Sequence, residues 1–169
     1  INTRNGDSKK IPFDLEGVFT PKWSPDGMRL AFVGNKNSAS DIYTIDLNTN
    51  EIVNLTSDIF SDSEPSWHPS SSKLLFVSDR GAKIDRVPTT AVDMIDHNFE
   101  QNNIYSIDIN TKVVEKITNS SSNKNYPIYA NTENVIFYTS DYNGTWNIFK
   151  HDLDSGNVYP VTNFITGLK

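Results

Sequence analysis

Pro21-Lys22-Trp23-Ser24-Pro25-Asp26-Gly27 is the stretch that decides the fold, because the chain returns to it twice. It recurs 44 residues later as Pro65-Ser66-Trp67-His68-Pro69, and a fainter copy, Pro127-Ile128-Tyr129, follows after another 62 residues. Self-similarity at a period of about 20–50 residues is typical of solenoids, propellers and similar arrays. The 169-residue chain is therefore built from copies of one unit.

The segments that follow this stretch repeat as well. Leu30-Ala31-Phe32-Val33 returns after 44 residues at 74–77 and after a further 62 at 136–139. Asp41-Ile42-Tyr43 returns in the opposite order of offsets, first after 62 residues at 103–105 and then after 44 at 147–149. The swap indicates a unit of 44 residues whose second copy carries 18 extra residues between Asp79 and Asn103. Each copy closes on a threonine, at Thr56, Thr118 and Thr162.

Each unit reads as four short strands. The Phe32-Val33 segment and its copies are apolar, β-branched or aromatic, whereas the segment at 41–47 and the last segment of each unit alternate in polarity. Ser24-Pro25-Asp26-Gly27 has the residues of a type I turn. Four strands in a unit of about 40–45 residues indicate a propeller blade. The sequence predicts an all-β fold, namely a β-propeller segment of three four-stranded antiparallel blades plus part of a further blade.

The repeat also sets the expected boundaries. Residues 1–19 are expected to hold the end of a preceding blade and its connection, and blades are expected at 20–58, 64–120 with an insertion at 80–102, and 126–164. Propeller rings usually need four to eight blades. The chain begins at Ile1 and ends at Lys169 in mid-connection, so we expect a fragment of a larger propeller, and the alternative is that copies associate to complete a ring. Its expected partners therefore include the remaining blades of its own chain or a second copy.

Composition narrows the function. The formal net charge of −6 disfavours nucleic acid as a partner. The absence of cysteine excludes disulfides and thiolate metal sites. No apolar stretch approaches the ~20 residues that a membrane helix needs, so direct membrane insertion is not expected.

No motif in the sequence supports a catalytic centre, and no catalytic, cofactor-binding or metal-binding residues are expected. There is no Gly-x-Ser-x-Gly elbow, phosphate-binding loop or dinucleotide fingerprint. Asp46, Asp108 and Asp152 recur at one repeat position, which favours a structural hydrogen bond over catalysis. The recurrence of Trp23, Trp67 and Tyr129 predicts packing between blades.

The insertion at 80–102 is the segment that the repeat does not require. Loops positioned by a rigid scaffold often carry function. His97 lies near Asp93 and Asp96, an arrangement that fits either a metal or acid/base cluster or a solvated polar loop. The apolar residues of the insertion predict either packing on the blade or contact with a partner. Two aromatic residues of the third copy are suited to stacking on a sugar. The candidate partner-binding residues are Arg86, Asp93, Met94, His97, Phe99, Tyr142 and Trp146.

The Pro-x-Trp-Ser-Pro-Asp-Gly-x-x-Leu-Ala-Phe run at 21–32 resembles the WD-like propeller repeat of the TolB family. Phe76-Val77-Ser78-Asp79-Arg80, the Asp-Ile-Tyr-x-Ile-Asp-Leu segment at 41–47 and Thr162-Asn163-Phe164 resemble the same repeat. The resemblance covers the chain apart from the insertion. It implies a bacterial, periplasmic or surface-exposed propeller that binds other proteins. The same repeat is found in the non-catalytic propellers of prolyl-oligopeptidase-type and tricorn-like peptidases.

Three functions remain open on this basis. The first is a non-catalytic scaffold that mediates protein–protein interaction in the bacterial cell envelope. The second is the propeller domain of a larger prolyl-oligopeptidase-type or tricorn-like peptidase, and the third is a carbohydrate-binding propeller in which Tyr142 and Trp146 stack on sugar. None of the three requires a cofactor.

Overall fold

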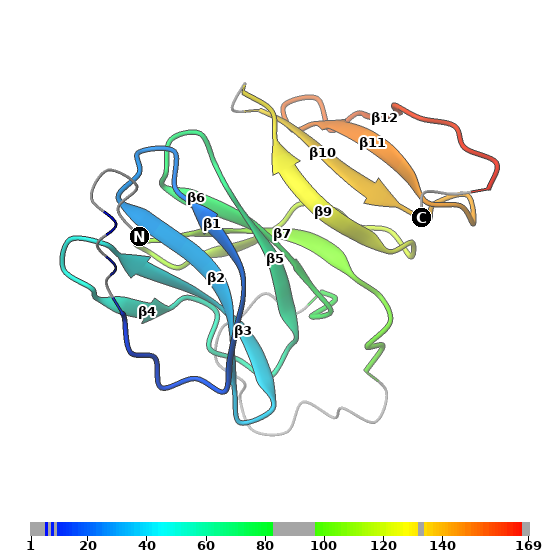
Figure 1. Cartoon of the computed structure of the whole chain (residues 1–169). Helices are drawn as coiled ribbons and strands as arrows, with labels where there is room; N and C mark the ends of the chain where they lie inside the picture. Colours follow the sequence, from blue (N-terminus) through cyan, green and yellow to red (C-terminus); the bar gives the residue numbers. More distant parts are fainter. Residues whose placement is uncertain (1–5, 7, 9, 83–96, 132–133, 167–169) are drawn as a thin grey trace.

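The described part of the chain is all-β. The structure, a computed structural model, describes residues 6, 8, 10–82, 97–131 and 134–166. Within these residues the strands form three four-stranded antiparallel sheets, and there is no helix (Figure 1). Consequently no described helix is long and apolar enough to cross a bilayer. These three sheets confirm the expected blades.

Strands follow one another in space as they do in sequence, so each sheet is a meander. The first sheet contains β1 (Gly17–Trp23), β2 (Arg29–Lys36), β3 (Ala39–Asp46) and β4 (Ile52–Asn54). The second contains β5 (Asp62–Trp67), β6 (Lys73–Ser78), β7 (Asn103–Asp108) and β8 (Val114–Lys116). The third contains β9 (Lys124–Tyr129), β10 (Val135–Ser140), β11 (Asn147–Asp152) and β12 (Val158–Pro160).

The 44- and 62-residue offsets hold in the strands themselves. β2, β6 and β10 begin at Arg29, Lys73 and Val135, which are 44 and 62 residues apart. The Ser24–Gly27 turn is also formed, since the Gly27 amide donates to the Ser24 carbonyl at 2.9 Å and Gly27 has a φ of 72°. A left-handed φ of this kind is accessible to glycine at little cost.

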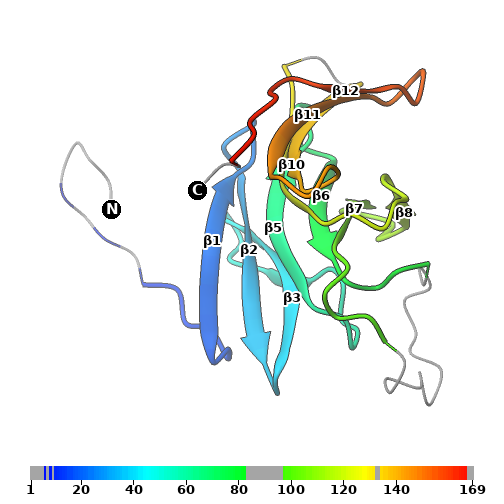
Figure 2. The same ribbon diagram turned by 90° about the vertical axis from the view of Figure 1, so that its right-hand side faces the viewer.

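The sheets stand side by side and contact one another through their first strands. β5 packs against β1, β2 and β3 (Figure 2), and β9 packs against β5, β6 and β7. Each first strand is irregular, with a left-handed residue immediately before its proline, at Thr20, Glu64 and Tyr126. Such irregularities bend a strand and increase its twist. The Glu64 carboxylate accepts a hydrogen bond from the Tyr126 amide, which joins the first strands of two sheets.

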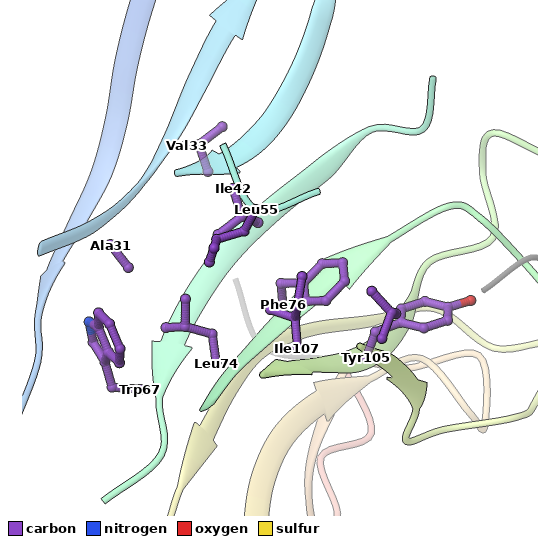
Figure 3. Close-up of a cluster of buried hydrophobic side chains, with 10 residues drawn as sticks. Ala31, Val33, Ile42, Leu55, Trp67, Leu74, Phe76, Tyr105 and Ile107 are labelled. Carbon is purple, nitrogen blue, oxygen red and sulfur yellow. The ribbon is translucent and has the colours of Figure 1, made fainter. Parts of the chain in front are cut away.

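The largest apolar core lies between the first and second sheets (Figure 3). Its buried members come from both sheets: Ala31, Val33, Ile42, Leu55, Trp67, Leu74, Phe76, Tyr105, Ile107 and Val114. A second cluster joins the second and third sheets through Leu75, Ile104, Ile136, Tyr138 and Phe149. Burial of apolar surface between the sheets therefore holds neighbouring blades together.

The recurring aromatic residues pack between sheets in two of the three copies. The Trp67 indole is buried and donates to the Lys22 carbonyl of the first sheet at 2.9 Å. Tyr129 lies edge-on to His68 of the second sheet, with ring centres 4.7 Å apart. Trp23 differs, because its side chain is 65% exposed. It shares a face of the first sheet with Leu30 and Ile45, and no described sheet covers that face.

Two polar devices recur in every blade. The threonine after the fourth strand accepts from a third-strand amide, as in Ile104 N to Thr118 Oγ1 at 2.9 Å, and its hydroxyl donates to Asn103 Oδ1 at 3.2 Å. Asp108 Oδ1 accepts two amides of the hairpin that follows it, those of Asn110 and Thr111. Asp46 and Asp152 make the equivalent contacts in their own hairpins. These bonds confirm the structural reading of the recurring aspartates.

Candidate functional site

The residues expected to bind a partner fall into three groups. Arg86, Asp93 and Met94 lie outside the described residues. His97 and Phe99 stand where the insertion returns to β7, and Tyr142 and Trp146 stand between β10 and β11. Because β6 ends at Ser78 and β10 ends at Ser140, both loops leave equivalent strand ends of neighbouring sheets.

The returning end of the insertion is fixed to the second blade through His97. Its side chain is only 5% exposed, and Nε2 lies 3.3 Å from Asp79 Oδ2. The imidazole also lies against Phe60, with ring centres 5.5 Å apart. The second oxygen of Asp79 accepts from the Ser61 amide at 2.9 Å. The described end of the insertion, from His97 onward, is therefore anchored on the second blade.

Phe99 follows His97 in the chain and lies at the surface. Its ring lies edge-on to His97 at 4.6 Å, yet 57% of the residue remains exposed. A large aromatic side chain held on a buried support is a common anchor for a protein partner. The structure thus brings two of the expected residues into contact and places one of them on the surface.

Near the His97–Asp79 contact lies a buried ionic group that was not among the residues predicted from the sequence. Arg80 is fully buried, with Nη1 3.1 Å from Asp58 Oδ2 and Nη2 2.7 and 2.8 Å from the two oxygens of Asp62. Its guanidinium lies 5.0–5.6 Å from three aromatic ring centres. We call this group, formed by Asp58, Phe60, Asp62, Phe76, Arg80 and Tyr105, the Arg80 socket.

Burial and charge act against each other in the Arg80 socket. Burial raises the pKa of Asp62 to about 7, while the nearby guanidinium acts to lower it. Burial also disfavours the charge on Arg80, but Asp62 and Asp58 outweigh it and raise its pKa. Because both oxygens of Asp62 accept from one guanidinium nitrogen, the geometry fits the ionised pair. The guanidinium is thus held inside the fold by two carboxylates.

Three buried acids in this region have the spacing of a metal site. Among the described residues, Asp41, Asp58 and Asp62 are the group whose carboxylates approach closely enough to share an ion. Arg80 already bonds to two of them. The oxygens of Asp41 accept from the Thr56 hydroxyl, the Asp58 amide and the Asn54 side-chain amide. The arrangement is an ion-pair network built around an arginine.

The same positions in the first blade hold a related pair. Lys36 stands where the second blade has Arg80, and its Nζ lies 2.6 Å from Asp14, which corresponds to Asp58. Phe32 and Tyr43 correspond to Phe76 and Tyr105, and their rings stack with centres 5.7 Å apart. The first socket is more open, but its cation and its acid occupy the same places.

The third blade reverses this pattern. Tyr142 stands in place of Arg80, Ser120 in place of Asp58, and Lys124 in place of Asp62. Lys124 is 3% exposed, and its Nζ donates to the hydroxyl of Ser120 at 2.6 Å and to the carbonyl of Ser122. Burial lowers the pKa of Lys124 to about 8, so the ammonium remains the main form at neutral pH. A buried acid has been replaced by a buried base.

A cavity of about 540 Å³ lies at this reversed socket. Its wall includes the equivalents of the Arg80 socket, namely Ser120, Ser122, Lys124, Tyr138, Tyr142 and Phe149. His151 reaches it from β11 with a buried Nδ1 that has no hydrogen-bond partner in the described part of the chain. Tyr142 is thus one of the expected residues at a cavity, whereas Trp146 is half-buried and does not line it.

Comparison with known proteins agrees with this architecture. The family model of the TolB beta propeller domain matches residues 6–93. The chain belongs to this family. The match confirms the resemblance carried by the Trp-Ser-Pro-Asp-Gly repeat.

Individual relatives extend the likeness beyond residue 93. The Tol-Pal system protein TolB of Francisella tularensis subsp. mediasiatica is 24% identical over 149 residues, which cover 88% of this chain and 30% of the relative. TolB from Acinetobacter baumannii superposes with a TM-score of 0.71 at 24% identity, over 89% of this chain and 33% of the other. The chain thus spans about a third of the length of these TolB proteins.

The same fold occurs in peptidases. A puromycin-hydrolyzing peptidase of Mycobacterium tuberculosis superposes with a TM-score of 0.68 at 12% identity, over 94% of this chain and 24% of the peptidase. At this identity the likeness shows the propeller fold alone. Membership of the TolB propeller family therefore rests on the repeat and the family match, and the chemistry must be argued from the site.

Proposed function

We propose that this chain is a non-catalytic TolB-like propeller segment that binds a protein partner in the bacterial cell envelope, in the periplasm or at the cell surface. The observation that carries the proposal is Phe99, which lies 57% exposed on the buried His97–Asp79 contact. The curated relatives supply the setting, since their name places them in the Tol-Pal system. The net charge of −6 favours a partner with a basic surface.

The described polar groups support a scaffold over an enzyme. Asp58 and Asp62 are both engaged by one internal partner, the buried guanidinium of Arg80. The recurring threonines and aspartates bond to the backbone of their own blades. A propeller that gates a peptidase remains the alternative function, and the propeller itself would be non-catalytic there too.

Site-specific photo-crosslinking at Phe99 tests the proposal. A photoreactive phenylalanine analogue at position 99, in cells that express the full-length protein, is expected to crosslink one envelope protein. The same analogue at Val113, which is 56% exposed on the β7–β8 hairpin, is the matched control. With the crosslinked partner purified, Phe99→Ala is expected to weaken binding by about 30-fold or more, since truncation of an aromatic hot-spot residue costs about 2 kcal/mol or more.

Two results would count against this function. If crosslinking is equal at positions 99 and 113, or if Phe99→Ala leaves the affinity unchanged, the end of the insertion that carries Phe99 is not the binding surface. A hydrolase domain encoded in the full-length gene, together with peptide cleavage by the full-length protein, would favour the peptidase alternative.

A further inference from the structure

The three sockets are the same construction with different contents. In the first two blades a cation at the end of the second strand (Lys36) or just after it (Arg80) meets an aspartate in the connection before the first strand (Asp14, Asp58). In the third blade these two positions hold Tyr142 and Ser120, and neither carries a full charge at neutral pH. The third socket has therefore lost the internal ion pair that the other two retain.

The charge that the third socket does hold is a buried cation without an acidic partner. Lys124 Nζ is bonded to the hydroxyls and carbonyls of Ser120 and Ser122, which are neutral. In the part of the chain that the structure describes, no carboxylate forms an ion pair with it. Asp141, the acid that acts on it through space, is already bonded to Asn123. A buried ammonium without a counter-charge is costly to maintain.

The space beside Lys124 is open rather than filled. In the Arg80 socket the guanidinium covers Phe76 and Tyr105. In the third blade the Tyr142 ring lies edge-on to Phe149, with ring centres 6.3 Å apart, and the rings of Tyr138, Tyr142 and Phe149 line the 540 Å³ cavity. That volume lies within the range of about 300–1,000 Å³ that small-molecule sites occupy. His151 contributes an independent sign of a ligand, because its Nδ1 is buried at the cavity and has no hydrogen-bond partner among the described residues.

We propose that this cavity, the Lys124 socket, binds a small organic carboxylate that carries a flat ring. The carboxylate would take the place of the missing counter-charge beside Lys124, and the ring would lie in the cavity against the exposed ring of Tyr142, above the edges of Tyr138 and Phe149. One buried ammonium matches one negative charge. The cavity is also lined by the side-chain amides of Asn119 and Asn143, which suit a ligand with hydroxyl groups.

Two sources share this chemistry, and they differ in the ring. A sugar acid presents the C–H face of a pyranose to the aromatic rings, and an aromatic hydroxy acid stacks its own ring there. D-glucuronate and 4-hydroxybenzoate are therefore the two probes. D-glucose and phenol are their uncharged counterparts. Inorganic phosphate tests whether an anion without a ring is sufficient.

Titration calorimetry on the 169-residue chain gives the first test. At least one carboxylate is expected to bind, with at least tenfold higher affinity than its uncharged counterpart and than phosphate. Lys124→Met is expected to lower that affinity at least tenfold, because a hydrogen bond from an ammonium to a carboxylate is among the stronger hydrogen bonds. Lys22→Met, at an exposed lysine of β1, is the control and should bind like the parent chain. Which probe binds decides between a sugar acid and an aromatic acid.

A second measurement does not depend on any variant folding correctly. Titration of the unmodified chain, followed by amide NMR, is expected to shift Lys124, Tyr138 and Phe149 and to leave Phe99 in place. The proposal is overturned if neither carboxylate binds at concentrations up to about 10 mM, a limit that corresponds to a very weak site. It is equally overturned if the uncharged probes bind as tightly, or if the shifts appear elsewhere. None of these results bears on the protein-binding role of Phe99.

Discussion

Arg80, Lys36 and Tyr142 occupy one repeat position, and the side chain at that position decides what each socket contains. Arg80 fills its socket and forms ion pairs with two buried aspartates. Lys36 is shorter and pairs with one aspartate at a more exposed site. Tyr142 is 66% exposed and leaves a cavity beneath it. The three blades thus share the same strands, whereas the charged side chains at equivalent socket positions differ from blade to blade.

Replacement of Arg80 by methionine is expected to destabilise the fold. Removal of one partner from a buried ion pair typically costs about 3–5 kcal/mol, because the remaining charges stay buried without compensation. The free energy of unfolding in urea, measured at pH 7, provides the value.

A triple variant separates pairing from packing. When Asp58→Asn and Asp62→Asn accompany Arg80→Met, part of the lost stability is expected to return, because the uncompensated charges are gone. If Arg80→Met costs no more than the exposed Lys22→Met, the ion-pair network contributes nothing to stability.

The repeat made some of these residues predictable and others not. Alignment at offsets of 44 and 62 already pairs Asp58 with Ser120, Asp62 with Lys124 and Arg80 with Tyr142. The same alignment therefore contains the reversal of charge from Asp62 to Lys124, in addition to the positions that are alike in all three copies. Burial was not visible, since Lys124 reads as one polar residue among serines and asparagines. The His97–Asp79 contact joins a residue before the insertion to one within it, and because only one copy of the repeat has an insertion, no equivalent residues exist in the other copies.

At the scale of strands, each blade is closed by its own threonine. Thr56, Thr118 and Thr162 accept the amides of Ile42, Ile104 and Ile148 at 2.9–3.0 Å. This bond joins the residue after the fourth strand to the beginning of the third. The recurrence of threonine at the end of every unit predicted a repeated feature, and the structure supplies its reason.

Thr118→Val is expected to open this closure in the middle blade. The variant keeps the shape of the side chain but leaves the buried Ile104 amide without its acceptor, at a cost of about 1–3 kcal/mol. Hydrogen exchange at the Ile104 amide should accelerate together with a fall in melting temperature. Thr118→Ser keeps the hydroxyl and is the control. Equal losses in the two variants would show that the methyl group, and not the hydrogen bond, is what matters.

Strand positions followed from the sequence because the same pattern occurs three times. Each blade repeats its apolar positions, and each copy constrains the reading of the others. The path of the insertion had no such support. Its amino acids indicate only that several side chains are apolar, and an apolar side chain can pack on its own blade or on a partner. Only the three-dimensional structure reveals that the His97 side chain is buried and that Phe99 is not.

At the scale of the whole molecule, the sheets at the two ends differ from the middle one. β1 presents Phe19 and Trp23, which are 51% and 65% exposed, and the segment after β11 presents Tyr159, Val161 and Phe164. In the middle, the equivalent Trp67 is buried against the first sheet. Apolar surface that is covered between blades is thus open at the ends of this chain.

The 169-residue chain is therefore expected to self-associate in solution. Size-exclusion chromatography with light scattering should show a mean mass that rises with concentration, because contiguous apolar patches favour contact between molecules. Trp23→Ser should weaken this association, and Val113→Ser, on a hairpin of the middle blade, should not. A monomer that persists at the highest concentration would contradict the expectation.

The three sockets have a consequence for how such proteins acquire ligands. A duplicated blade carries a spare copy of each stabilising pair, so one copy can lose its pair while its neighbours still hold the array together. Where Tyr142 and Ser120 stand in place of Arg80 and Asp58, the third blade has a cavity with aromatic walls, and the charge of Lys124 is opposite to that of Asp62 at the same repeat position. Repetition in this chain thus supplies ready-made sites for divergence, without any change to the backbone.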